Sequence, residues 1–149
     1  MATISGGERL ERALADIAHR LNKPATLKVG FLENATYPDG TKVALVAALN
    51  EFGVPSHNQP PRPFFRNMIS KHAKSWPASI EAGLRATNYD VNLTLQYAGM
   101  GISDQLRDSI NELWSPPLSP VTVKRKGFDK PLIETVHMRN SVAYEVVIK

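Results

Sequence analysis

Acidic residues and histidines are the side chains from which this chain could build a metal site, and their spacing argues against one. Asp104 and Asp108 lie four residues apart, which would place two carboxylates on one face of a helix. Two carboxylates are a weak signal, and Arg107 beside Asp108 favours a solvated helix face instead. The four histidines are His19, His57, His72 and His137, and none lies two to four residues from another. Metal sites need clustered donors, so we expect no bound metal.

Nucleophilic and phosphate-binding chemistry finds equally little support. The sequence contains no Cys, and therefore no thiol nucleophile, thiolate ligand or disulfide. It has no G-x-S-x-G, P-loop or G-x-G-x-x-G pattern. We therefore predict that the chain is not an enzyme and binds no cofactor. A small hydrolase with a Ser-His-Asp site is the enzymatic alternative, and no constellation of residues supports it.

The most informative stretch favours a fixed surface rather than a reaction site. A short apolar helix is expected to end at Glu51, Phe52 and Gly53, and a proline-rich loop then leads to a second helix. Successive prolines favour a stiff, extended backbone, which would deliver aromatic and arginine side chains to one place. The residues predicted to lie at a subunit interface are Glu51, Phe52, Arg62, Phe64, Phe65, Arg66 and Trp114.

Two details of this surface stay open at the level of sequence. Glu51 is expected beside Arg62 or Arg66, either as a structural ion pair that fixes the loop or as an exposed pair worth under about 1 kcal/mol. Phe64 and Phe65 are neighbours about 100° apart on a helix, so one can point inward and the other outward. An outward Phe near Arg62 and Arg66 has the composition of an interface anchor.

The elements that must position these residues follow from apolar periodicity. Helices are predicted at residues 8–21, 42–51, 64–75, 78–86 and 88–114, a short turn at 135–140, and strands at 26–31 and 142–148. Thr41 and Thr135 are expected to cap the 42–51 helix and the 135–140 turn. The expected inward residues of the 64–75 helix are Phe65, Met68, Ile69 and His72 or Ala73. Together these predict an α+β fold, in which a small, mostly antiparallel sheet is packed by several helices.

Other local features sharpen this picture. The turn at 37–40 has Pro38 and Gly40 where a β-turn favours them. The helix at 42–51 is apolar almost all round, which predicts that it is buried or sandwiched. Gly99 and Gly101 each cost about 1 kcal/mol in a helix interior relative to Ala, so they indicate either close packing of another backbone or a break.

Length and charge set the remaining bounds. A chain of 149 residues fits a single domain, 1–149, with a long proline-rich and basic loop or arm at about 115–131. The longest apolar run has seven residues, whereas a membrane span needs about 20, so we expect no membrane partner. The net charge of +4 is mild. The one dense basic run, Lys124, Arg125 and Lys126, reads either as a solvated loop or as a DNA-facing contact.

Two segments of the sequence resemble a known protein family. The first joins the turn at 37–41 to the stretch Ala47–Arg66, which contains Asn50-Glu51-Phe52-Gly53 and Pro60-Pro61-Arg62-Pro63-Phe64-Phe65-Arg66. The second starts at Trp114-Ser115-Pro116-Pro117-Leu118-Ser119-Pro120 and continues through Arg125-Lys126-Gly127, Lys130-Pro131-Leu132-Ile133-Glu134-Thr135 and Met138-Arg139-Asn140-Ser141-Val142-Ala143-Tyr144. In this order, over roughly half the chain, they resemble the neck and tail-completion proteins of tailed bacteriophages.

The resemblance implies a structural role in the virion. Members of that family form a ring, with six subunits as the family expectation, that joins the tail to the head or completes the tail end. The implied partners are further copies of the chain, other phage neck and tail proteins, and passing DNA held without specificity. The implied location is the virion, after synthesis in the cytoplasm of the host bacterium. The family pattern has Gly where this chain has Val136, which places the local turn at 135–137 in question.

Alternatives remain within and outside this reading. A tail terminator and a head-side connector differ from a tail-completion subunit by partner surface rather than by chemistry. A small basic DNA-binding module is the alternative of another class. It would require one face to gather Arg62, Arg66, Arg85, Lys124, Arg125 and Lys126.

Overall fold

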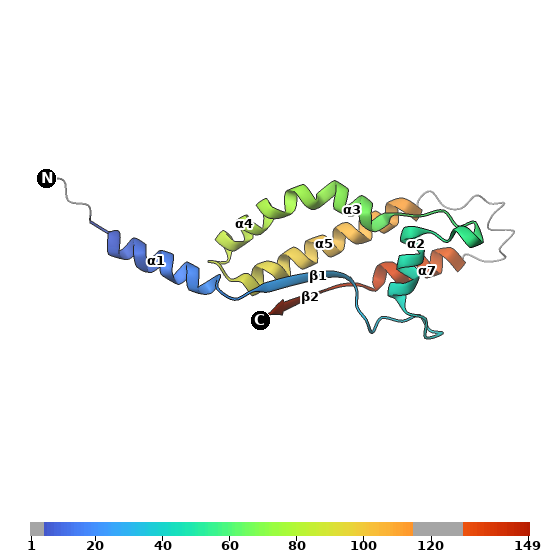
Figure 1. Ribbon diagram of the computed structural model, residues 1–149, viewed down its shortest axis with the longest axis horizontal. Helices are drawn as coiled ribbons and strands as arrows, with labels where there is room; N and C mark the ends of the chain where they lie inside the picture. The colour runs from blue at the N-terminus through green and yellow to red at the C-terminus, as the bar shows by residue number, and fades with distance from the viewer. Residues whose placement is uncertain (1–4, 115–129) are drawn as a thin grey trace.

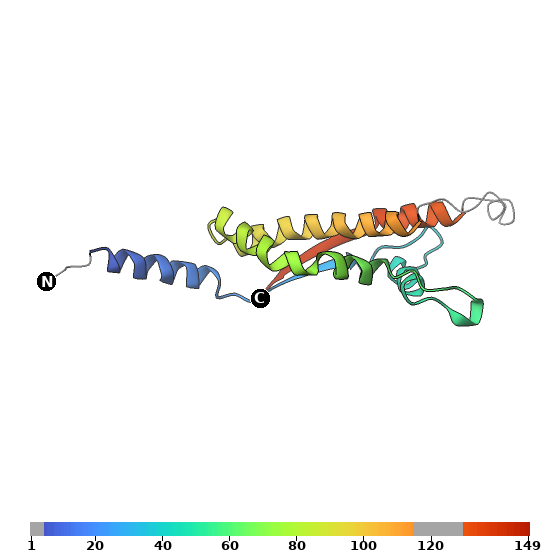
Figure 2. The same cartoon turned by 90° about the horizontal axis from the view of Figure 1, so that it is seen from above.

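The computed structural model describes residues 5–114 and 130–149, which form an elongated α+β molecule (Figure 1). A two-stranded antiparallel sheet packs against one long helix, α5 (Val91–Trp114). The first helix, α1 (Gly7–Arg20), projects from one end of this body in both views (Figures 1 and 2). The predicted fold class is therefore confirmed.

The sheet joins the two ends of the sequence. Strand β1 (Ala25–Phe31) pairs with β2 (Val142–Ile148) in a register that runs from Ala25 opposite Ile148 to Phe31 opposite Val142. Both strands were predicted from alternating apolar residues, within one residue at each end. A pair of strands cannot bury a core by itself, so the sheet depends on α5 for its stability.

Helix α5 contributes more buried core residues than any other described element. Ile102, Leu106 and Ile110, three of the residues that follow the predicted helical period, are buried along its inner face. Gly99 lies where this helix crosses the sheet: a Cβ atom there would stand 2.5 Å from the Tyr144 ring. Close packing thus explains Gly99, although the close neighbours are the side chains of Tyr144 and Leu27 rather than the backbone that was predicted. Gly101 has no heavy atom within 4 Å of its Cβ position, and no contact explains it.

A second row of helices lies alongside α5. It consists of α3 (Phe64–His72), a 3₁₀ turn η2 (Ala73–Ser75) and α4 (Trp76–Ala86). Pro77 occupies the first turn of α4, where the absence of an N–H costs nothing. Trp76 Nε1 donates to Gln105 Oε1 over 2.9 Å and ties this row to α5. Because α3 and α5 also contact each other, the row closes one side of the core.

Helix α2 (Val43–Phe52) follows the predicted turn. The N–H of Gly40 donates to the Tyr37 carbonyl over 2.9 Å, and Gly40 has a positive φ of 88°. The prediction that Thr41 caps this helix is wrong: Lys42 stands at the N-cap, and no side chain caps there. The Thr41 N–H instead donates to Asp39 Oδ1 over 2.9 Å, so the turn rather than the helix uses this position.

Helix α7 (Lys130–Asn140) leads into β2. Thr135 was predicted to begin a short turn, but it lies in mid-helix and is 8% exposed, so that prediction is wrong. Val136 belongs to the same helix and has no positive φ. A β-branched residue is therefore unstrained there, which answers the question raised by the family's glycine.

Candidate interaction surface

Glu51 organises the junction between α2 and α3. Its side chain is 8% exposed; Oε2 accepts the Phe65 N–H over 2.8 Å and Oε1 accepts the Arg66 N–H over 3.1 Å. These two N–H groups belong to the first turn of α3, where helical donors lack partners within the helix. Pro63 holds the N-cap position and has no side chain that could accept them. Glu51 therefore caps α3 from another helix.

Arg66 closes the same junction from the other side. Its Nε donates to Glu51 Oε1 over 2.8 Å, and its Nη2 donates to the Glu51 backbone carbonyl over 2.9 Å. Hydrogen bonds between ionised partners are among the strong ones in proteins. The structural ion pair is thus the interpretation that the geometry favours, and Arg66 rather than Arg62 is its cation. We call Glu51, Phe65 and Arg66 the junction residues.

The loop between the two helices is held at both ends. Arg62 N–H donates to the Asn50 carbonyl over 2.7 Å, and Gln59 Nε2 donates to Asn50 Oδ1 over 3.2 Å. Gly53 has a φ of 74°, and a Cβ atom there would lie 2.7 Å from both the Gln59 oxygen and the Pro61 nitrogen. The predicted glycine stop is confirmed, although its ψ of 171° lies outside the left-handed helical region.

The two neighbouring phenylalanines divide their roles. Phe64 is 1% exposed and meets the Phe31 ring edge to face, with ring centroids 6.3 Å apart. Phe65 is half-buried and packs against Phe64. Phe65, which was predicted to point inward, is only partly buried but packs against the core, whereas Phe64, which was left out of that set, is the fully buried ring. Ile69, also predicted inward, is 41% exposed, whereas Met68 is buried as expected.

An apolar surface adjoins the junction residues. Phe52 is 67% exposed, and the Arg66 guanidinium carbon lies 5.4 Å from the centre of its ring. The exposed residues on the same side of this helix, called here the α2 outer face, are Ala44, Leu45, Ala48, Leu49 and Phe52. The opposite side buries Val43 and Ala47. Within the described part of the chain, the helix is thus covered on one side only, whereas the sequence predicted burial or sandwiching.

The remaining predicted interface and DNA-facing residues are placed unevenly. Arg62 is half-buried in the loop. Trp114 is the last residue of α5, and its side chain lies outside the described part of the structure. Lys124, Arg125 and Lys126 also lie outside the described residues, so nothing is concluded about their neighbours. Sequence reasoning missed Leu45 and Leu49 as surface residues, although their unbroken apolar run was the available signal.

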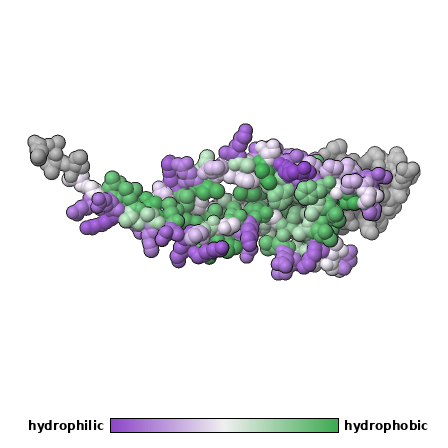
Figure 3. Space-filling view, in the orientation of Figure 1, coloured by the Kyte–Doolittle hydropathy of each residue, from purple (hydrophilic) through white to green (hydrophobic). Residues whose placement is uncertain are grey.

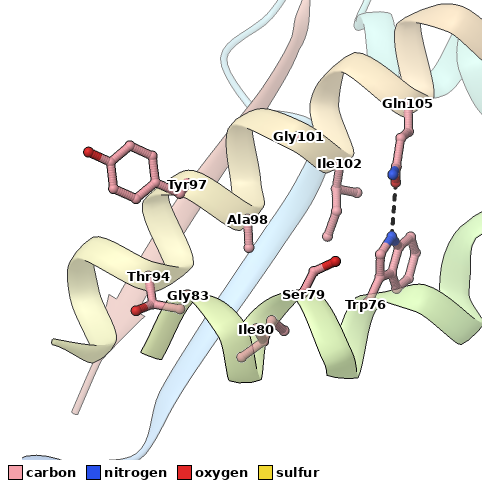
Figure 4. A pocket seen from close by; sticks show the side chains of 10 residues that line it. All are labelled: Trp76, Ser79, Ile80, Gly83, Thr94, Tyr97, Ala98, Gly101, Ile102 and Gln105. Atoms are coloured by element: carbon pink, nitrogen blue, oxygen red, sulfur yellow. Dashed lines mark hydrogen bonds between the residues drawn. The ribbon is translucent and has the colours of Figure 1, made fainter. Parts of the chain in front are cut away.

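A groove between α4 and α5 was not anticipated from the sequence. It has a volume of about 220 Å³ and is bordered by both large and small residues of the two helices, as Figure 4 shows. The lining residues are Trp76, Ser79, Ile80, Gly83, Thr94, Tyr97, Ala98, Gly101, Ile102 and Gln105. None of them is an acid, a Lys, an Arg, a His or a Cys. The groove therefore offers shape and a few hydroxyl and amide groups rather than catalytic groups.

The described residues show no inorganic site. Across residues 5–114 and 130–149, no group of three or more His, Cys, Asp or Glu side chains is close enough to hold a metal ion. Asp104 accepts from Arg107 Nη1 over 2.8 Å and its side chain is 73% exposed, which agrees with the predicted solvated helix face. Among the same residues, no helix combines the length and apolarity that crossing a bilayer requires.

A comparison with protein-family models, curated proteins and solved structures finds no significant match to this chain.

Proposed function

We propose that the chain is a structural subunit of the neck or tail end of a tailed bacteriophage, in which copies join head to tail into a ring. The role needs no catalysis and no cofactor. The proposed location is the virion, with other neck and tail proteins as neighbours. A ring of six is the number that the family resemblance suggests.

The observation that carries the proposal is the role in the fold of the stretch Ala47–Arg66, which resembles the phage family. Its glutamate and second arginine, Glu51 and Arg66, bond to each other and to the start of α3. Motif residues that form these hydrogen bonds hold α2 and α3 in a fixed arrangement. They build a structural junction rather than a reaction site. The apolar α2 outer face begins at the same corner, and exposed apolar patches mark contact sites. A fixed junction of two helices beside an exposed apolar face suits a contact that is repeated between copies of a subunit.

Head-to-tail contacts suit this role because they use two different surfaces of one chain. Such heterologous contacts close into rings when the rotation between copies allows it. A mild positive charge would suit a ring whose lumen carries DNA without gripping it. The basic residues Lys124, Arg125 and Lys126 are the proposed DNA-facing group. A tail terminator and a head-side connector remain alternatives, which partner binding would separate.

The DNA-binding alternative draws less support. Of its proposed arginines, Arg66 is bonded to Glu51, and Arg85 pairs with Glu81 over 2.7 Å. Guanidinium groups already paired with carboxylates contribute less to phosphate binding. Tight, steeply salt-dependent DNA binding by a monomer would nevertheless favour that alternative.

The native mass of the purified protein, followed by electron microscopy of the oligomer, tests the proposal. We expect closed rings of a single copy number. The control is a variant with Leu49→Glu on the α2 outer face, which should remain folded and lose the ring. A monomer at every concentration that binds DNA tightly would argue for the DNA-binding module.

A further inference from the structure

Helix α1 carries an apolar stripe that no other residue in 5–114 or 130–149 covers. Leu10 is 61% exposed, Leu14 56% and Leu21, just past its end, 44%; the helix has no buried residue. It projects from the body in both views, and hydrophobic side chains reach the surface along it in Figure 3. A helix of 14 residues is marginal in water without packing. The stripe therefore calls for a covering surface outside its own subunit.

The α2 outer face is a second uncovered apolar surface, at the other end of the molecule (Figure 1). Its five residues include no polar side chain, since the one acidic residue of this helix, Glu51, turns into the junction. At 1.5 Å per residue, the face from Ala44 to Phe52 is about 12 Å long, and the stripe from Leu10 to Leu21 is about 16 Å long. The α2 outer face is therefore somewhat shorter than the stripe, and the two surfaces match in apolar character.

We propose that α1 of one copy packs on the α2 outer face of the next copy. The inference rests on the proposed self-association and names the surfaces that make it. The two faces cannot meet within one chain, because α1 points away from the end that carries α2 (Figures 1 and 2). Every copy carries both faces, so each contact leaves one of each free for a further copy. That is the pattern of a heterologous contact, which closes into a ring when the rotation between copies allows it.

Charge and size favour a second copy as the occupant. Helix α1 has three acids and three arginines, Glu8, Glu11, Asp16, Arg9, Arg12 and Arg20, and so no net charge to oppose a neutral face. Two helix faces of this length bury less than the roughly 800 Å² per partner of a standard interface. A single contact should therefore be weak, and a closed ring, in which each subunit makes two, should be favoured.

The α4–α5 groove is the competing acceptor. It is bounded by Tyr97, which is 60% exposed, and it contains polar groups from Ser79, Thr94 and Gln105. Its volume of about 220 Å³ admits one or two side chains, not a stripe of four. The α2 outer face is the better match for α1 both in its apolar character and in its size.

The absence of Cys from the sequence allows a direct test by cross-linking. Two single-cysteine variants, Leu14→Cys and Leu49→Cys, are purified separately, one with an affinity tag, then mixed and oxidised. Both positions are exposed, so circular dichroism should match the wild type. We expect a covalent heterodimer, and a ladder of larger species when one chain carries both substitutions. Arg12→Cys, on the opposite side of α1 from the stripe, should lose the cross-link to Leu49→Cys.

Each contrary outcome has a distinct meaning. Cross-linking of Leu14→Cys to itself would show that α1 pairs with α1 and would overturn the inference. Cross-linking to Tyr97→Cys instead of Leu49→Cys would place α1 in the groove and overturn the acceptor. Rings in the native mass without any cross-link from Leu14→Cys would refute the docking and leave the ring proposal standing. A monomer at every concentration would count against both.

Discussion

Glu51 and Arg66 are fifteen residues apart and meet at a single corner, where the Glu51 carboxylate accepts the side-chain Nε of Arg66 over 2.8 Å and its backbone N–H over 3.1 Å. One carboxylate at the end of α2 thereby caps the start of α3 and joins the two helices. The Glu51 side chain is 8% exposed and that of Arg66 is 57% exposed. The Glu51 carboxylate is thus the buried member of the pair, and its charge must be satisfied by the hydrogen bonds that it accepts.

Replacing Glu51 should destabilise the protein substantially. In Glu51→Ala, the N–H groups of Phe65 and Arg66 lose their acceptor in a half-buried site, and we expect a loss of about 2–4 kcal/mol in the free energy of unfolding. Glu112→Ala is the matched control, because Glu112 pairs with Lys71 at a 62% exposed site and should change stability by under about 1 kcal/mol. Urea denaturation measures both. Equal losses in the two variants would mean that the junction is not stabilising.

Two glycines with positive φ should respond unequally to alanine. Gly53→Ala strains the backbone and brings a Cβ atom to 2.7 Å from two backbone atoms of the loop, so we expect a loss above about 2 kcal/mol. Gly40→Ala has a φ of 88° but no atom within 4 Å, and should cost only about 1 kcal/mol. The difference between their unfolding free energies reports the steric overlap at Gly53 together with the greater backbone strain of an Ala at its φ of 74° and ψ of 171°. A larger loss for Gly40→Ala would contradict the loop geometry.

A second pair of glycines, in α5, should respond with opposite sign. Gly99→Ala places a methyl group 2.5 Å from the Tyr144 ring and should cost about 1–3 kcal/mol. Gly101→Ala points into open space within a helix and should gain up to about 1 kcal/mol from helix propensity. Thermal melting of both variants measures the contrast. Stabilisation by both substitutions would show that β2 does not pack on α5 as described.

These contrasts also show where sequence reasoning succeeded and where it stopped. The two strands and the long helix were predicted because their apolar residues repeat at a constant period, which reports the buried face directly. Gly99 and Gly101 were indistinguishable, since only the position of Tyr144, over forty residues away, tells them apart. No local sequence pattern can indicate a contact between residues so far apart in the sequence.

Capping and side-chain direction were the weaker predictions. Thr41 and Thr135 have good capping side chains, yet the structure uses Thr41 in a turn and places Thr135 inside a helix. Tertiary packing, rather than the local preference of Thr for capping positions, determined where the helices α2 and α7 begin. Phe64 was left out of the predicted inward set because a one-residue error in helical phase rotates a side chain by about 100°. The Glu51–Arg66 pair was foreseen as a possibility, and only the fold could choose between the two arginines.

Substitutions on the α2 outer face should weaken self-association and leave the free energy of unfolding almost unchanged. Leu49 is 44% exposed, so Leu49→Glu should change the free energy of unfolding by under about 1 kcal/mol while abolishing self-association. Gln96→Glu adds the same charge at an exposed position of α5 and should leave association intact. Sedimentation velocity separates the two variants. Loss of association in both, or in neither, would remove the face from the interface.

The most direct test of the ring is the native mass of the wild-type protein over a range of concentrations, with electron microscopy of the largest species. The account predicts one closed stoichiometry, visible as rings and lost in Leu49→Glu. A monomer at every concentration, together with tight and steeply salt-dependent binding to DNA, would contradict it.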